Sequence, residues 1–265
     1  VIVNQINWRV DNLIIGTLTN SKTLGIFNIG SQLVFSFIAF ASAISNIFTP
    51  KIVQMVKQNV SHAVLMAQLC SIGRFQMIVL GYIFVIFTVF GELFIDLFVG
   101  AEFSEAFLVA LIPMVPFIFV LAQTSTNAVL QALNKHKVRS LLLLGTAFAN
   151  VVVSIILVKK LGMIGAVWGT AIALFVGELL LVNIYLYRVV GLNMLHFYQQ
   201  LLRYSMPVML ISMPLAFVFF NYLPATWFGL ILGCFFTGFI YLVLSYFLSL
   251  MPLERQDVKR LIFSR

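Results

Sequence analysis

Charged residues are scarce in this sequence. Asp, Glu, Lys and Arg make up 9% of its 265 residues, whereas hydrophobic residues make up 62%. In a soluble domain about a quarter of the residues are charged. Because so few charges cannot keep a surface of this size hydrated, we expect lipid to surround most of the chain. Its function should then be one that a bundle of membrane helices can perform.

Cysteine and histidine are also sparse. Cys70 and Cys234 have no paired spacing, and His62, His136 and His196 are scattered along the chain. Metal sites and disulfide frameworks are recognised by closely spaced ligands, and this sequence has none. We therefore expect no metal site and no resident cofactor, and we predict that both cysteines are small buried side chains.

Long apolar stretches fill most of the chain. A membrane-crossing helix needs about 20 apolar residues, and in hydrocarbon the backbone must satisfy its own hydrogen bonds, which leaves helices or closed barrels. The stretches are continuous rather than alternating, which favours helices. We predict an all-α membrane protein, a polytopic bundle of about eight transmembrane helices at 1–19, 24–49, 75–99, 107–133, 140–158, 164–187, 205–222 and 228–250.

The connections between these stretches are short. Residues 50–74 and 189–204 are the longest; they mix apolar and basic residues and resemble amphipathic helices on the membrane surface. No connection is large enough to hold a nucleotide-binding or catalytic domain. We therefore expect that the chain is not an enzyme.

Basic residues gather on alternate connections. One set holds only Lys22, Lys159 and Lys160. The other set, with the C-terminal segment, holds Lys51, Lys57, Arg74, Lys135, Lys137, Arg139, Arg188, Arg203, Arg255, Lys259, Arg260 and Arg265. Cytoplasmic connections carry the excess of Lys and Arg. This pattern predicts a multi-pass protein of the inner (plasma) membrane with a cytoplasmic C-terminus, whose net charge of +8 contacts anionic lipid rather than nucleic acid.

The first apolar stretch is unusually polar. Its polar side chains cover about half of a helix with about 3.6 residues per turn, and a charge inside the membrane costs at least ~2.5 kcal/mol. This helix therefore lines a water-filled cavity, or it protrudes into the cytoplasm because an upstream part of a longer protein precedes Val1. The sequence leaves both open. The residues concerned are Asn4, Gln5, Asn7, Arg9, Asp11 and Asn12.

The cavity alternative gives these side chains specific roles. Arg9 is the candidate that binds an anionic substrate, because guanidinium grips phosphate oxygens as a fork. Asn4, Asn7 and Asn12 are candidates beside it. Asp11 is a candidate for coupling to Na⁺ or H⁺, although a structural cap or a pair with another helix explains it equally well.

Two other acids lie within predicted helices. An intramembrane acid is by default a functional candidate, so Glu92 and Glu178 are further candidates for ion coupling. Structural alternatives stay open for both. Glu92 could reach the outer headgroups, and Glu178 could pair with a basic residue of a neighbouring helix.

Proline and small residues predict where helices bend and pack closely. Pro113 and Pro116 precede a polar patch at 123–127. They predict a bend, which is either static or used in alternating access. Small residues at 165–173 predict a close approach of this helix to a neighbour.

Three segments resemble one known family. Residues 10–30, VDNLIIGTLTNSKTLGIFNIG, resemble the Asp-x-x-x-Ile-Gly…Leu-Gly-x-Tyr segment of polysaccharide-export flippases, with Phe27 where Tyr is usual. Residues 91–106 resemble the outer-edge motif of that family, and residues 131–171 resemble its basic loop, Asn-bearing helix and Gly-x-x-Gly-Ala turn. Over nearly all of residues 4–190 the chain thus resembles the O-antigen and lipid-linked oligosaccharide flippases of the multidrug/oligosaccharidyl-lipid/polysaccharide exporter superfamily.

The resemblance implies an architecture and a function. It implies two six-helix lobes that face each other across a cavity. Residues 1–190 would form the second lobe, and 191–265 an interfacial helix, two additional transmembrane helices and a cytoplasmic tail. The first lobe would be an upstream part of the same protein.

The implied activity is that of a flippase. It would move a lipid-linked oligosaccharide or polysaccharide repeat unit across the membrane by alternating access, as lipopolysaccharide and polysaccharide export require. A multidrug/cation antiporter of the same superfamily is the alternative. A membrane-embedded polysaccharide polymerase or ligase is the alternative of another class.

Overall fold

Every regular element of the described chain is a helix. The computed structural model describes the backbone of residues 2–250 and the side chains of residues 10–250. The elements are α1 (Ile2–Leu18), α2 (Ser21–Lys57), α3 (His62–Phe98), η1 (Ala101–Phe103), α4 (Ala106–Ala122), α5 (Thr126–Ala132), α6 (His136–Leu161), α7 (Met163–Leu174), η2 (Phe175–Leu181), α8 (Val182–Tyr185), η3 (Leu186–Val190), α9 (Met194–Tyr222), α10 (Trp227–Leu244) and η4 (Ser245–Ser249). The all-α prediction is confirmed.

Most of these helices are suited to cross a membrane. Within the described range six helices are long and apolar enough, and the bent pair α4 and α5 makes a seventh. The helix α1 has 17 residues, fewer than the about 20 that span hydrocarbon. The order of the segments follows the prediction, but the count of eight transmembrane helices is not confirmed.

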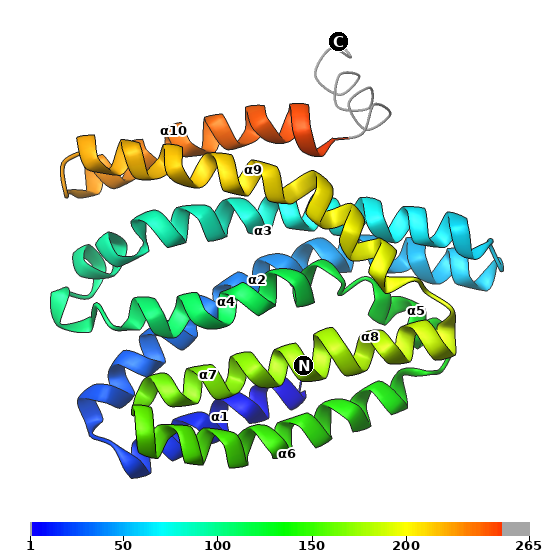
Figure 1. Ribbon diagram of the computed structural model, residues 1–265, viewed down its shortest axis with the longest axis horizontal. Helices are drawn as coiled ribbons and strands as arrows, with labels where there is room; N and C mark the ends of the chain where they lie inside the picture. The colour runs from blue at the N-terminus through cyan, green and yellow to red at the C-terminus, as the bar shows by residue number, and fades with distance from the viewer. Residues whose placement is uncertain (1, 251–265) are drawn as a thin grey trace.

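The helices lie side by side in an elongated bundle (Figure 1). The helices α9 and α10 pack against α3 on one side of the bundle. On the other side α1 and α7 both pack against α6, and α4 lies between α2 and α7. Apolar residues from all the long helices form one buried core, whose largest fully buried side chains include Phe27, Phe37, Phe90 and Tyr241.

The connections divide between the two ends of the bundle, as Figure 1 shows. Residues 58–61, 133–135 and 191–193 lie at one end, which we call the basic end because Lys57, Lys135 and Arg188 flank these connections. At the other end, Lys22 in the first turn of α2 forms an ion pair with Glu102 of η1, with 3.3 Å between Nζ and Oε2. The members of the two charge sets that fall within residues 2–250 therefore lie toward opposite ends of the bundle, whereas the basic residues of 251–265 lie outside the described residues. The cytoplasmic placement of the basic end remains a prediction.

The predicted surface helices are continuations of longer helices. The helices α2 and α3 have 37 residues each, which at 1.5 Å per residue is about 55 Å. That exceeds a hydrocarbon core of about 30 Å, so part of each helix must project beyond it. Residues 50–57 and 62–74 are the ends of these helices, and residues 194–204 are the first turns of α9. Neither region forms a separate surface helix.

Close packing of α6 and α7 depends on glycine. A Cβ added at Gly165 would overlap the backbone of Leu157 in α6, and one added at Gly169 would meet the side chains of Ser154 and Asn150. The predicted close approach at the small residues is therefore confirmed. It brings polar groups of α6 directly against α7.

Candidate functional site

A polar cavity of about 710 Å³ lies among α1, α2, α4, α5, α6 and η2. Twelve of its nineteen lining residues carry amide, hydroxyl or charged side chains, and the other seven are apolar, among them Phe35 and Phe117. The polar lining residues are Asn12, Ser42, Ser45, Asn46, Thr49, Gln123, Thr124, Thr126, Asn127, Gln131, Arg139 and Glu178.

The cavity lies in the half of the bundle toward the basic end. Arg139 is in the first turn of α6, Gln131 is near the end of α5, and Thr49 is in the last third of α2. All three helix ends point to the basic end (Figure 1). A substrate that enters from this side therefore meets the polar lining early.

Arg139 and Glu178 form an ion pair in the cavity wall. Their Nη2 and Oε1 atoms are 2.6 Å apart, and the Glu178 residue is 4% exposed. The Nε atom of Arg139 is buried and has no hydrogen-bond partner among the described residues. Because Glu178 uses a single nitrogen in this bond, the guanidinium keeps further donors for an anion. The structure thus shows Glu178 paired with a basic residue of a neighbouring helix, and its role in ion coupling stays a prediction.

The bend between α4 and α5 forms another part of the wall. The two helices differ in direction by 49°, and the break falls at residues 123–125 rather than at Pro113 or Pro116, which lie inside α4. Gln76 of α3 donates to Thr124 at 3.1 Å and to Ser45 of α2 at 2.5 Å. Ser45 and Thr124 also share a hydrogen bond. A bend is present, but it lies beyond α4 in the polar patch and not at the prolines, so the predicted position was wrong. Side chains from α2 and α3 hold its middle residue.

Asp11 lies in a second polar cluster, outside the cavity lining. It is 1% exposed and accepts a hydrogen bond of 2.6 Å from Thr170 of α7. The Nδ2 atom of Asn150 in α6 donates to the hydroxyl of Thr170 at 3.5 Å. The hydroxyl of Ser154 donates to Oδ1 of Asn150 at 3.3 Å and also lies beside the Asp11 carboxyl. Oδ1 of Asp11 accepts no hydrogen bond from a described residue, and no described basic residue pairs with this carboxylate.

The remaining predicted site residues fall in three places. Asn12 lines the cavity. Glu92 is exposed on α3 and does not line the cavity, so the structure does not bring it to Asp11 or Glu178. The side chains of Arg9, Asn4 and Asn7 lie outside the described residues, and their roles stay predictions.

Sequence reasoning missed Arg139. It stands in a basic run with Lys135 and Lys137, which was assigned as a whole to a cytoplasmic connection. The helix α6 begins at His136, so Arg139 falls in its first turn and faces Glu178. Helical periodicity could have identified Arg139, because in a helix that begins at His136 the members of the basic run point in different directions and one of them can face inward.

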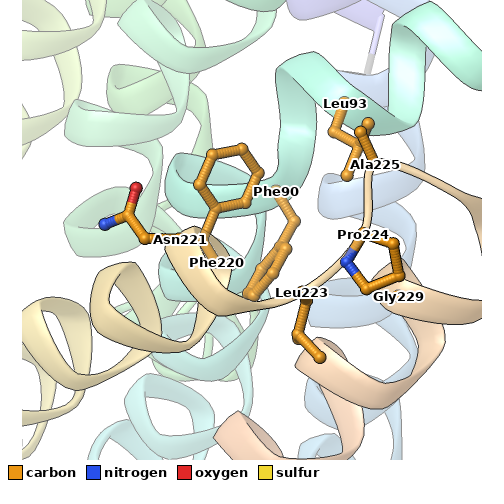
Figure 2. A pocket seen from close by; sticks show the side chains of 8 residues that line it. All are labelled: Phe90, Leu93, Phe220, Asn221, Leu223, Pro224, Ala225 and Gly229. Carbon is orange, nitrogen blue, oxygen red and sulfur yellow. The ribbon is translucent and has the colours of Figure 1, made fainter.

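A smaller cavity of about 240 Å³ lies at the opposite end of the bundle, between α3 and the α9–α10 connection. Figure 2 shows that Phe90, Leu93, Phe220 and Leu223 are among the side chains that line it. Asn221 is its single polar side chain, and no charged group lines it. It has no features of a binding site for a sugar or phosphate.

Comparisons with known proteins agree with the sequence resemblance. Residues 1–108 match a family model described as polysaccharide biosynthesis protein. The chain is 25% identical over 177 residues to the capsular polysaccharide biosynthesis protein CapF of Staphylococcus aureus, a match that covers 66% of this chain. These matches confirm the resemblance to a polysaccharide biosynthesis family. The chain spans 44% of the length of CapF in this match, and no solved structure gives a significant match.

The fold and the matches together support a polysaccharide-related, multi-pass membrane protein. Among the residues that the structure describes, no three His, Cys, Asp or Glu side chains come together as metal ligands. Cys70 is buried and Cys234 is half-buried, and neither forms a disulfide. Amides, hydroxyls and one ion pair therefore supply the polar chemistry of the cavity.

Proposed function

We propose that this chain is part of a flippase that moves a lipid-linked oligosaccharide or polysaccharide repeat unit across the cytoplasmic membrane by alternating access. The observation that carries the proposal is the polar cavity with Arg139 in its wall, inside helices that are suited to cross a membrane. The family match and the similarity to CapF support a role in polysaccharide biosynthesis.

The lining suits a sugar attached to an anionic lipid headgroup. Sugar hydroxyls lose water contacts inside the membrane, and an uncompensated polar group there costs several kcal/mol. Side chains such as Asn46, Thr49, Asn127 and Gln131 offer both donors and acceptors that replace those contacts. Arg139 offers a fixed cation with planar donors, which suits a phosphate or diphosphate. Arg9 stays a second candidate for this role.

The proposed transporter requires a second wall. By the family resemblance, residues 1–190 form one of two six-helix lobes, and the other lobe belongs to an upstream part of the same protein. In the proposed cycle the cavity is exposed to the cytoplasmic leaflet when the lobes separate at the basic end. It is exposed to the opposite leaflet when they separate at the other end. The prenyl-like tail of the substrate remains in lipid, and only the polar head enters the cavity.

Coupling to a cation gradient is proposed at Asp11. Asp11 has no basic partner among residues 10–250, whose side chains the structure describes. A buried carboxylate in that situation is neutralised by a proton or a bound cation. The hydroxyls of Thr170 and Ser154 and the amide oxygen of Asn150 are hard oxygen ligands beside it. With a single negative charge, the cluster suits Na⁺ or H⁺ rather than a divalent ion, which takes several carboxylates.

Surface polysaccharide display tests the proposed function. The full-length protein carrying Arg139→Gln is returned to cells that lack the native copy, beside wild type and an exposed-charge control, Lys160→Gln. We expect a strong loss of display for Arg139→Gln alone, measured per amount of protein in the membrane, because loss of the ion pair also lowers stability. Full display by Arg139→Gln would contradict the role of this cavity in transport.

A further inference from the structure

A chain of side-chain hydrogen bonds leads from α9 into the cavity wall. Tyr198, in the second turn of α9, donates its phenolic hydrogen to Oε1 of Gln123 at 2.8 Å. The same oxygen of Tyr198 accepts a hydrogen bond of 3.2 Å from Asn183. The tyrosine ring is held by edge contacts with Phe119 of α4 and with its neighbour Phe197. Its hydroxyl is therefore fixed in both position and direction.

The hydroxyl of Tyr198 sets the orientation of the Gln123 amide. Gln123 lies at the break between α4 and α5 and is 4% exposed. Because its Oε1 accepts from Tyr198, its Nε2 points the opposite way and donates to the backbone oxygen of Glu178 at 3.1 Å. An amide that lost the hydroxyl partner could rotate and release this second bond.

The last member of the chain is the ion pair of the cavity. Glu178 lies in η2, a π-helical segment of the kind that is frequent at functional sites. Its carboxylate holds Arg139 from α6. The position of α9 is thus connected to Arg139 through Gln123 and Glu178, by bonds that join α9, the α4–α5 break, η2 and α6.

We infer that Tyr198 is a positioning residue for the Arg139–Glu178 pair, and that α9 is thereby a working part of the substrate site. The helix α9 contributes no residue to the cavity lining. It acts on the cavity through the Gln123 amide, which ties the wall segment that carries Glu178. The effect on transport rests on the proposed function, whereas the effect on the shape of the cavity does not.

A thiol reporter in the cavity tests this inference without any transport measurement. Asn127→Cys is placed in full-length protein in which Cys70 and Cys234 have been replaced, and its reaction rate with a small hydrophilic thiosulfonate is measured. Tyr198→Phe removes only the hydroxyl. The matched control is Tyr82→Phe. The hydroxyl of Tyr82 also bonds to a C-terminal helix, since it donates to the backbone oxygen of Cys234 in α10 at 3.0 Å. Tyr82 itself lies on α3, outside the cavity lining.

We expect Tyr198→Phe to change the labelling rate at position 127 and Tyr82→Phe to leave it unchanged. Ser104→Cys, at the far end of the bundle, should label equally in all backgrounds. A rate for Tyr198→Phe equal to that of the Tyr82→Phe control would overturn the inference.

Discussion

Arg139 and Glu178 lie 2.6 Å apart, on α6 and η2, in the wall of a cavity inside a bundle of apolar helices. Their charges cancel, so the cavity is polar without a large net charge of its own. The pair keeps an arginine inside the bundle where an unpaired one would be very costly. It also keeps that arginine beside the space that the proposed substrate enters. The same contact therefore accounts for the stability of the site and for its proposed chemistry.

The ion pair should contribute measurably to stability. Removing one partner of a buried pair typically costs about 3–5 kcal/mol, because the other charge is left uncompensated. We expect Arg139→Gln to lower the thermal stability of the purified protein, and Arg139→Gln with Glu178→Gln to restore most of it. The control is Lys22→Gln, which breaks the exposed pair with Glu102 and should have almost no effect. Equal effects at the exposed and the buried pair would show that the cavity pair is not buried as described.

Cation coupling should depend on Asp11. In proteoliposomes with an imposed Na⁺ or pH gradient, wild-type transport should accelerate with one of the two. Asp11→Asn should abolish that acceleration, since the amide keeps the shape but has no charge to neutralise. Thr170→Val should weaken it, because the hydroxyl beside the carboxylate is lost. Thr88→Val is the matched control, because Thr88 bonds back to its own helix on α3. Gradient-driven transport by Asp11→Asn would rule out this coupling site.

The contact between α6 and α7 should be sensitive to a single methyl group. Gly165→Ala forces a Cβ into the backbone of Leu157, and overpacking of this kind typically costs about 1–3 kcal/mol. Gly145→Ala in α6 meets nothing within 4 Å and should be neutral or raise stability by up to about 1 kcal/mol. Thermal unfolding of both variants in detergent measures the difference. A neutral Gly165→Ala would mean that the two helices lie farther apart.

Orientation can be checked with one cysteine at each end of the bundle. We expect Ser104→Cys, beside η1, to react with an impermeant thiol reagent in intact cells. Gln58→Cys, between α2 and α3 at the basic end, should react only after the membrane is opened. The expectation follows from the excess of Lys and Arg on cytoplasmic connections. The reverse labelling pattern would invert the protein in the membrane.

The length of the apolar stretches predicts where the helices lie, and the basic residues predict which connections share one end of the bundle. Both features depend on local composition, which the sequence gives directly. The spacing of Gly165 and Gly169 likewise predicted a close helix contact that the structure shows. The site was harder to predict, because it depends on which way each side chain faces. Arg139 was assigned to a connection, yet it lies one turn inside α6. The sequence predicts one cavity lined by both Asp11 and Asn12, but Asp11 packs against α7 and only Asn12 lines the cavity.

The two predicted surface helices show a different limit. The sequence at 50–74 has the mixed apolar and basic composition of a helix lying on a membrane, but the same composition suits the projecting ends of long transmembrane helices. In the structure residues 50–57 and 62–74 belong to α2 and α3, and residues 194–204 are the first turns of α9, so neither region is a separate helix. Their place at the membrane surface stays a prediction. Composition alone does not report where one helix ends and the next begins.

The most direct test of the proposed function is lipid flipping by purified full-length protein. Proteoliposomes are prepared with a fluorescent lipid-linked oligosaccharide that carries a diphosphate, and its exposure on the opposite leaflet is followed with an impermeant quencher. We predict that wild-type protein exposes the substrate, and that Arg139→Gln and empty liposomes do not. A sugar-free prenyl phosphate that moves equally well would show that the polar cavity does not recognise the sugar. Flipping by Arg139→Gln at the wild-type rate would contradict the central role of the Arg139 cavity.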